Sequence, residues 1–313
     1  MDDQEWLLSS SMMKLTVDPT VLDSRFVLLY FRDKGRDELL SRASTVGTPG
    51  IGQPLTSLRS ISIPLPPLAE QQAIAQVMGA LEDKIAANTA LAATAEHMLQ
   101  AEIDAEWLRG EDRSSTLSDF AELNPKVAAP RTQAAVYIDM KRLPESGWSI
   151  DGLDYREPMG GARFQNGDTL LARITPCLEN RKTGFVDHLE DEQVGIGSTE
   201  FIVLRARNDI AAPISFLLAT APRFRDHAIQ HMVGTSGRQR VAVSDLASFK
   251  MPTPEPGWLA GFGSRAVAVF QAVAAQSAEN RTLAATREAL LPQLMSGKLR
   301  VRDAEAAASE AGA

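Results

Sequence analysis

A proline-rich connector leads into a long interval without proline: Ile61-Ser62-Ile63-Pro64-Leu65-Pro66-Pro67-Leu68-Ala69-Glu70-Gln71-Gln72. Proline fits the first helical turn without loss of a hydrogen bond, so the pair at 66 and 67 is a helix-start signal. No proline follows from Leu68 to about Leu108. Apolar residues recur there near a heptad spacing, at Ile74, Val77, Leu81, Ile85, Leu91, Ala95, Met98 and Leu99. This pattern predicts a long helix with a coiled-coil face.

An internal repeat accompanies this connector. Three sets of residues recur in the same order. The first, Val46-Gly47-Thr48-Pro49-Gly50, recurs as Val233-Gly234-Thr235-Ser236-Gly237, and the second, Leu58, Ile61, Pro64 and Pro66, recurs as Leu246, Phe249, Pro252 and Pro254. The third, Asn88 with Leu91-Ala92-Ala93-Thr94, recurs as Asn280 with Leu283-Ala284-Ala285-Thr286. The offset between copies is about 190 residues. That period is too long for a solenoid and is typical of a duplicated module. Each module is predicted to be a mixed domain, a proline-rich connector and a long helix.

The second long helix is predicted to start after Pro256-Gly257 and to stop near Ser296-Gly297, a good C-cap. Its apolar residues are Phe262, Val269, Val273, Leu283, Leu290 and Leu294. Asn88 and Asn280 fall in the predicted seams, where a buried asparagine sets helix register at some cost in stability. The alternative is a solvent-facing asparagine. The matched placement of the pair favours two helices packed against each other.

The region between the helices predicts short strands. Candidate strands are 136–138, 169–172 and 200–204, separated by glycines, and 214–230 has the pattern of one helix. The predicted fold class is therefore α+β, with loops presented at one face and an internal duplication.

Composition limits the class of protein. The chain has 313 residues, one cysteine and a net charge of -8, which excludes a disulfide scaffold, a collagen-like fibre and a mostly disordered chain. No apolar run approaches the ~20 residues of a membrane span, and the acidic start is unlike a signal peptide, so a cytoplasmic location and no membrane contact are predicted. Residues 1–112 carry 9 Lys/Arg and 17 Asp/Glu, whereas residues 113–250 carry 17 of each. The acidic total therefore does not exclude nucleic acid as a partner of the second module.

Catalytic motifs are not found in the sequence. Gly297-Lys298 lacks the rest of a phosphate-binding P-loop, and neither an Asn/Asp-Pro-Pro-aromatic methyltransferase motif nor a strand-linked G-x-G-x-x-G is present. His227 and His231 are four residues apart but have no third ligand nearby, and Cys177 has no neighbouring histidine. We therefore predict no catalytic residue, no metal site, no cofactor and a buried Cys177 thiol.

Two segments carry side chains suited to nucleic acid. The first, 167–184, follows a predicted strand, and the second, 234–240, is a glycine-bounded loop. Arginine, lysine, asparagine and threonine donate to phosphates, and arginine and asparagine also bind base edges. The candidate DNA-binding residues are Arg173, Thr175, Asn180, Arg181, Lys182, Thr235, Ser236, Arg238 and Arg240. The alternative is that the glycines only make turns and the arginines pair with acidic neighbours.

With these motifs, the sequence resembles the specificity (S) subunits of type I restriction-modification systems. The resemblance rests on residues 61–72 followed by Asp83-Lys84-Ile85 and Asn88, on 167–184 with 197–201, and on 290–299. It implies target-recognition domains that each bind one half of a split DNA site, spaced by two long antiparallel helices. It also implies that adenine methylation and ATP-driven cleavage belong to partner subunits.

The resemblance implies a division of the chain into five parts. These are the C-terminal part of a first target-recognition domain at 1–66, a first spacer helix at 67–112, a second, complete recognition domain at 113–255, a second spacer helix at 256–298, and a short end and tail at 299–313. The first module is expected to be incomplete, because Met1 aligns about 75 residues into it. The Ala/Glu/Ser-rich tail is expected to be disordered.

The leading functional hypothesis is a non-catalytic subunit that recognises double-stranded DNA. Its implied partners are methyltransferase (M) subunits and, through them, restriction (R) subunits, with a second copy or a second S fragment to complete the first module. The alternative is an orphan or truncated coiled-coil assembly subunit that binds methyltransferase subunits, or dimerises, without reading a full DNA site. An enzyme with an unrecognised site is a third hypothesis.

Overall fold

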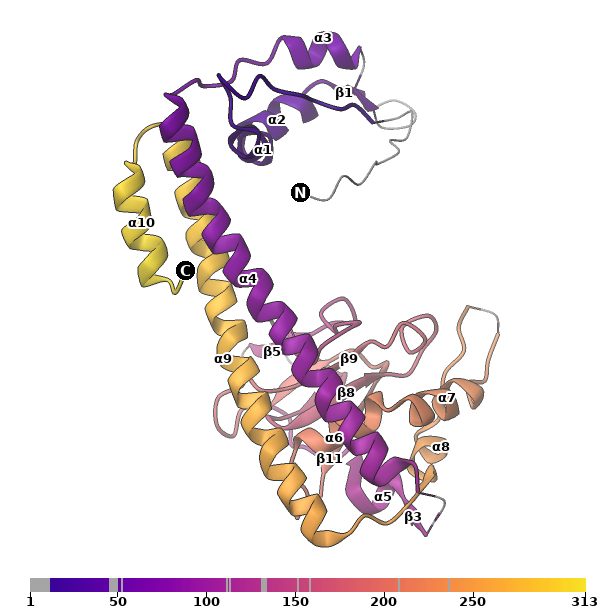
Figure 1. The fold of residues 1–313 in the computed structure, drawn as a ribbon. Helices are drawn as coiled ribbons and strands as arrows, with labels where there is room; N and C mark the ends of the chain where they lie inside the picture. Colours follow the sequence, from indigo (N-terminus) through magenta and orange to yellow (C-terminus); the bar gives the residue numbers. More distant parts are fainter. Residues whose placement is uncertain are drawn as a thin grey trace. The chain divides into compact units, whose positions relative to one another are not determined.

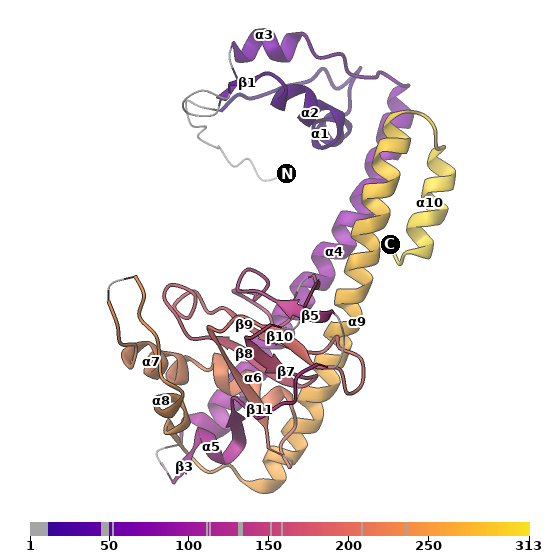
Figure 2. The same cartoon turned by 180° about the vertical axis from the view of Figure 1, so that it is seen from behind.

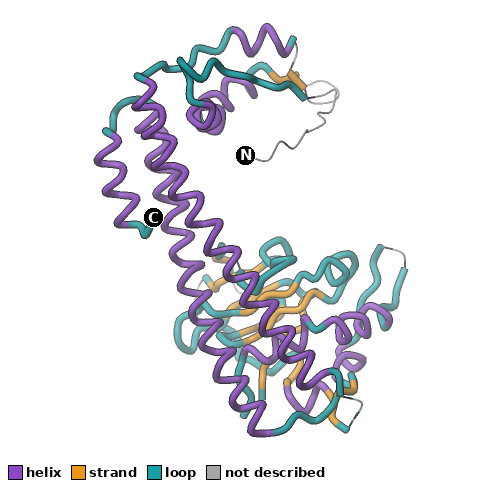
Figure 3. The backbone as a smooth tube through the Cα atoms, in the orientation of Figure 1, coloured by secondary structure: helices purple, strands orange, loops and turns teal. Residues whose placement is uncertain are grey.

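A computed structural model gives the structure of the chain. It describes residues 12–44, 50–51, 53–110, 112, 114–130, 134–150, 152–157, 159–207, 209–235 and 237–313. The chain forms two compact units: unit 1 is Met1–Ala87 with Ala278–Ala313, and unit 2 is Asn88–Ser277. Two long helices, α4 (Leu68–Ile103) and α9 (Pro256–Met295), each contribute residues to both units (Figure 1, and purple in Figure 3).

Unit 1 is mostly helical. Its other elements are α1 (Ser24–Arg32), α2 (Lys34–Leu40), β1 (Ala43–Ser44), β2 (Gly50–Ile51), α3 (Pro54–Arg59) and α10 (Val301–Glu310). The Asp23 side chain caps α1 by accepting from the amides of Arg25 and Phe26. The core joins Phe26, Leu29 and Tyr30 of α1 to Ile74, Met78 and Leu81 of α4, Leu283, Leu290 and Leu294 of α9, and Ala304 and Ala308 of α10. The apolar faces predicted near the start of α4 and the end of α9 are therefore buried together.

The expectation of a disordered tail was wrong. Residues 301–310 form α10, and Ala304 and Ala308 are buried in the core of unit 1. These alanines are four residues apart, so they lie on one helix face, and alanine has the highest intrinsic helix propensity. Charged residues and small alanines alternate along this segment, so its narrow apolar face gives only a weak sequence signal.

Ion pairs between α4 and α9 confirm the antiparallel arrangement. In unit 1, Glu82 contacts Arg287 at 3.9 Å and Lys84 contacts Glu279 at 3.6 Å, so numbers rise along one helix as they fall along the other. In unit 2, Arg265 of α9 pairs with Glu102 of α4.

The predicted heptad positions Leu91 and Met98 are exposed, and that part of the prediction was wrong. The predicted positions Ala95 and Leu99 do pack on the core of unit 2, together with Ala92, which was not predicted. A strict seven-residue repeat drifts around a helix that has 3.6 residues per turn.

The structure confirms the internal duplication. In unit 1, α1, α2 and α3 each begin 188 or 189 residues before α6 (Pro213–Thr220), α7 (Pro222–Gln230) and α8 (Val243–Ala247) of unit 2. Helix α4 begins 188 residues before α9. The repeated motif at 46–50 lies mainly outside the described residues, and its second copy is in the loop after α7.

Unit 2 contains two four-stranded sheets (Figures 1 and 2). The strands are β3 (Ser115–Thr116), β4 (Ala121–Leu123), β5 (Ala135–Ile138), β6 (Asp154–Arg156), β7 (Ala162–Phe164), β8 (Asp168–Ala172), β9 (Thr183–Phe185), β10 (Gly195–Gly197), β11 (Phe201–Ala206) and β12 (Lys250–Met251). One sheet has the order β6-β5-β10-β7 and the other β4-β11-β8-β9, while β12 pairs with β3. Only the β5–β10 pair among these described ladders is parallel. A short helix α5 (Leu117–Phe120) and a π-helical turn at Asp104–Leu108 complete the unit.

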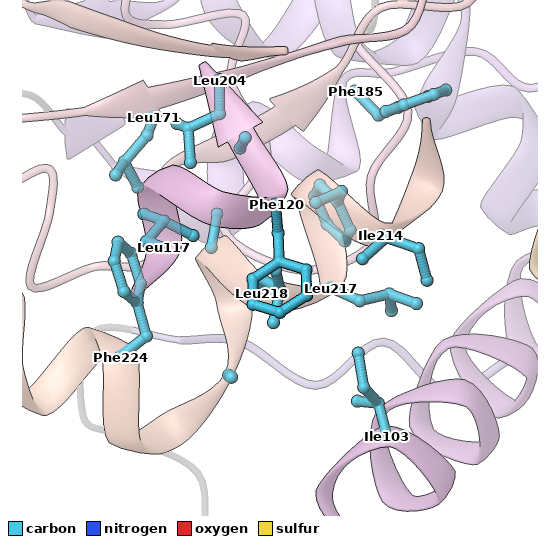
Figure 4. Packing of buried hydrophobic residues seen from close by; sticks show 14 of the residues in the cluster. Ile103, Leu117, Phe120, Leu171, Phe185, Leu204, Ile214, Leu217, Leu218 and Phe224 are labelled. Carbon is cyan, nitrogen blue, oxygen red and sulfur yellow. The ribbon is translucent and has the colours of Figure 1, made fainter. Parts of the chain in front are cut away.

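The central strands of unit 2 are buried on both faces. Phe201 and Val203 of β11 pack in the core between the sheets, whereas Ile202 and Leu204 face α6. Alternate side chains of a strand point to opposite faces, so this strand needs an unbroken apolar run. Figure 4 shows the α6 side of the core, with Ile103 of α4 and Leu217 of α6 pointing toward one another.

The single helix predicted at 214–230 is two helices. Helix α6 ends at Thr220 and α7 begins at Pro222. Ala221 between them has an extended ψ of 134°. Proline lacks an amide hydrogen and disfavours helical backbone in the residue before it, which breaks the helix here.

Helix α9 is long and apolar enough to cross a membrane by length and composition alone, although no such run was expected from the sequence. Within unit 2, however, Phe262, Ala266, Phe270 and Val273 of this helix are buried in protein core, and Arg265 interrupts its surface. Core helices pass the same test, so the evidence for a membrane span is weak.

Candidate nucleic-acid interface

The structure brings the two predicted binding segments of unit 2 together. We call residues 173–182, after β8, and 233–241, between α7 and α8, the loop pair. The Thr175 amide donates to the Gln239 carbonyl at 3.1 Å, and the Gln239 amide donates to Thr175 Oγ1 at 2.9 Å. Thr175 therefore holds the two loops together, and its hydroxyl is already engaged within the protein.

Gly234 is required by the local backbone of the second loop. Its φ is 139°, which L side chains rarely adopt, and a Cβ there would lie 2.8 Å from the Arg238 carbonyl oxygen. The glycine thus allows the chain to reverse and present Thr235 and Arg238, both of which are exposed.

Arg240 of the loop pair is bound to Glu200, which immediately precedes β11. Its Nε donates to both carboxylate oxygens at 3.0 and 2.9 Å, and its Nη2 donates at 2.6 Å. These hydrogen bonds lower the pKa of Glu200 and raise the pKa of Arg240. The charge of Arg240 is therefore largely balanced within the fold. This agrees with the alternative interpretation, in which the arginines of these segments pair with acidic neighbours.

We expect the Arg240→Gln variant to return the pKa of Glu200 toward its ordinary value of 4.5. The folded-state pKa is lowered, so stabilisation by this ion pair is present above pH 4.5 and disappears as the pH falls through the lowered pKa. Carboxyl titration by NMR measures the change. Glu255 is the control, because its lowered pKa comes from the amides of Gly257 and Trp258. An unchanged Glu200 titration would contradict the assignment.

Arg181 is also paired within the fold. It has a left-handed φ of 64°, and its guanidinium donates to the buried Glu96 of α4. The other oxygen of Glu96 accepts from the Gly147 amide at 2.9 Å. Lys182 similarly donates to the Leu143 carbonyl at 3.2 Å. These two side chains anchor the first loop of the loop pair rather than extending freely from it.

The remaining candidates differ in their exposure. Asn180, Thr235 and Arg238 are exposed, whereas Arg173 is half-buried. Ser236 lies outside the described residues. Among the predicted DNA-binding residues that the structure describes, these four leave their side-chain donors least engaged by other parts of unit 2.

A cleft of about 540 Å³ adjoins the loop pair at Arg173. It is lined by Asn124, Pro125, Lys126, Val127, Gly161, Ala162, Arg163, Arg173, Thr199, Phe201 and Val203. Lys126 and Arg163 were not predicted from the sequence, because both lie outside the two segments whose residue types indicated nucleic acid. Their only sequence signal is single basic residues beside Asn124-Pro125 and within β7.

The other predictions about site chemistry have mixed outcomes. Cys177 is half-buried, less than expected. The rings of His227 and His231 lie 4.0 Å apart, and across the described parts of the chain no three metal-ligating residues gather as a candidate metal site. Asn88 is buried on α4 and Asn280 is half-buried on α9. Their role in helix register stays a prediction.

Comparisons with known proteins agree with this architecture. Residues 1–97 match the family model described as type I restriction modification DNA specificity domain. The chain is 32% identical over 149 residues to the EcoAI type I restriction enzyme specificity subunit of Escherichia coli, and 30% identical over 147 residues to its EcoEI counterpart. These matches cover 45% and 44% of this chain but only 25% and 24% of the relatives.

A crystal structure supports the fold over a larger part of the chain. It is the S subunit of a type I restriction-modification system from M. genitalium, with a TM-score of 0.51 over 89% of this chain and 74% of that chain. At 15% identity, this likeness concerns the fold alone. Residues 1–97 are thus similar to a type I restriction modification DNA specificity domain, the chain spans about a quarter of the length of the curated specificity subunits it matches, and its fold is similar to that of an S subunit.

Proposed function

We propose that this chain is a non-catalytic DNA sequence-recognition subunit of a type I restriction-modification complex, and that unit 2 contacts double-stranded DNA through the loop pair. The observation that carries the proposal is the side-by-side placement of two polar loops more than fifty residues apart in sequence. Exposed Asn180, Thr235 and Arg238 supply donors to phosphates and base edges. Arg181, Lys182, Thr175 and Arg240 support these loops from within.

In this function, adenine methylation and ATP-driven cleavage would be carried out by other subunits. Methyltransferase subunits would dock on this chain and restriction subunits would join through them, so the chain needs no cofactor and works in the cytoplasm. The proposed recognition domain is 113–255, the proposed spacer helices are 67–112 and 256–298, and 1–66 belongs to a first recognition domain. A second copy or a second S fragment remains a proposed partner of that first domain.

A coiled-coil assembly subunit that does not read DNA is the second candidate function. It is favoured by the ion pairs that Arg181 and Arg240 make with Glu96 and Glu200, since these carboxylates balance half of the arginines predicted to bind DNA. Under this candidate, the long helices would bind methyltransferase subunits and the loop pair would have no role.

Substitution of exposed loop residues separates the two functions. We expect Asn180→Ala with Arg238→Gln to weaken binding to the preferred duplex at least tenfold, because each good base contact contributes about 1–3 kcal/mol. Binding of the full chain to random duplex pools, with and without methyltransferase subunit, measures affinity and preference. Wild-type affinity should also fall steeply with salt.

The matched control is Lys250→Gln, which removes an exposed cation on β12 outside the loop pair. Assembly with methyltransferase should be unchanged in all variants. Wild-type protein that is indifferent to both salt and DNA sequence would rule out DNA recognition. Unchanged DNA binding by the loop variant would show that the loop pair does not contact DNA.

A further inference from the structure

The cleft beside the loop pair has an unbalanced charge. Three of its lining residues are cationic, Lys126, Arg163 and Arg173, and none of the described lining residues carries a carboxylate. Lys126 and Arg163 are exposed, so their charged groups reach solvent. A concave surface with one sign of charge concentrates ions of the opposite sign.

Strand pairing and hydrogen bonds fix Lys126 and Arg163 on the walls of the cleft. The Asn124 amide donates to the Val203 carbonyl at 2.7 Å, and the Val203 amide donates to Asn124 Oδ1 at 2.9 Å, which ties the segment before Lys126 to β11. Arg163 is in β7, paired with Ile196 of β10. One of its Nη atoms donates to the Val127 carbonyl at 2.9 Å, so the two walls are joined across the cleft.

Arg173 is shared by the cleft and the loop pair. Its amide donates to the Glu200 carbonyl at 3.0 Å, and its own carbonyl accepts from the Val241 amide at 3.0 Å. Its Nε is buried without a hydrogen-bond partner among the described residues. A buried donor without a partner costs free energy, which an acceptor bound in the cleft would offset.

The Glu200 carboxylate near Arg173 is already engaged. Glu200 interacts electrostatically with Arg173, but its oxygens accept three hydrogen bonds from Arg240. Arg173, Arg240 and Glu200 together carry a net positive charge where the cleft adjoins the loop pair. Lys126 and Arg163 add two further positive charges along the cleft.

We propose that this cleft holds a phosphodiester group of the DNA backbone beside the loop pair. Phosphate contacts fix the register of a protein on duplex DNA, whereas base contacts supply sequence preference. The cleft therefore positions the duplex, and the exposed residues of the loop pair read it. This inference rests on the proposed function, since it needs duplex DNA as the partner of unit 2.

Salt dependence distinguishes a phosphate contact from a base contact. The observed binding constant falls with salt with a slope of about -0.9 for each phosphate neutralised. We expect Lys126→Gln and Arg163→Gln each to make this slope shallower by up to about 0.9 and to weaken all duplexes by a similar factor. The preferred sequence selected from a random pool should stay the same. The Lys250→Gln control should change neither quantity.

The measurement uses the full chain and short duplexes over a range of salt concentrations. Circular dichroism melting is the folding control: we expect no change for Lys126→Gln, whose side chain is exposed, and a small loss of stability for Arg163→Gln, which removes the hydrogen bond to the Val127 carbonyl. Wild-type slope and affinity in both cleft variants would overturn the phosphate site while leaving DNA recognition by the loop pair intact. A changed sequence preference with an unchanged slope would also overturn it, in favour of base contact. Wild-type protein without salt-dependent duplex binding would instead overturn the proposed function, and this inference with it.

Discussion

Replacement of Trp148 by alanine should destabilise unit 2 by about 3–5 kcal/mol, the usual cost of removing a large buried aromatic side chain. Trp148 is 1% exposed. Its ring is stacked on Phe270 of α9, with centroids 4.0 Å apart and planes 3° apart. It also meets the Phe216 ring of α6 edge-on at 6.2 Å. The substitution would remove the side chain that joins the loop after β5 to both helices.

The Trp148→Phe variant is the matched control. The indole Nε1 is buried with no partner among the described residues, so its loss removes no hydrogen bond seen in the structure. We expect this variant to lose less than half as much stability as the alanine variant, because phenylalanine retains a ring against Phe270. Urea unfolding followed by circular dichroism gives both values. Equal losses would show that aromatic stacking at this position contributes little.

The Asp168→Asn variant should lose about 3 kcal/mol, the lower end of the usual cost of removing one partner of a buried ion pair, because the Arg205 side chain is partly exposed. Asp168 is fully buried at the start of β8. Its carboxylate accepts from Nε and Nη2 of Arg205 at 2.7 and 2.6 Å, and from the Gln165 amide at 2.8 Å. The carboxylate raises the pKa of Arg205 through these hydrogen bonds, whereas burial raises the pKa of Asp168 in spite of them, so the pair offsets only part of the cost of burying this carboxylate. Asparagine keeps the size and an acceptor for Gln165 but leaves the guanidinium without its counter-charge.

A double-mutant cycle isolates the pair. The Arg205→Met substitution removes the cation, so Asp168→Asn should cost at least 1 kcal/mol less in that background than in the wild type. Chemical unfolding of the four proteins supplies the cycle. An identical cost in both backgrounds would mean that the two side chains do not stabilise one another.

The helices and the duplication could be predicted because their signals are local or repeated. Proline at the helix starts, glycine at 297 after the second helix and the recurring motifs each act through backbone rules that do not depend on distant residues. The strands at 136–138 and 169–172 were predicted for a related reason. Burial on both faces requires short apolar runs between turn residues.

The candidate site was only partly predictable. The residue types of the two loops indicated nucleic acid, but no local signal shows that Arg181 pairs with Glu96, 85 residues earlier. Nor does any show that Arg240 pairs with Glu200. An arginine has the same sequence signature whether it faces a carboxylate or solvent. The structure therefore separates the anchoring cations from the exposed ones, a distinction that the residue pattern left open.

Local sequence patterns specify the two long helices, several of the short strands, the polar loops and their duplication. Helix and strand propensity, proline and glycine geometry and apolar periodicity act within a few residues. These signals can therefore be recognised in a single sequence without knowledge of the fold. Tertiary structure decided which loops meet, which charges are balanced, and that Lys126, Arg163 and Arg173 line one cleft. Those facts depend on contacts between segments distant in sequence, and Coulomb attraction and burial are set by distance in space.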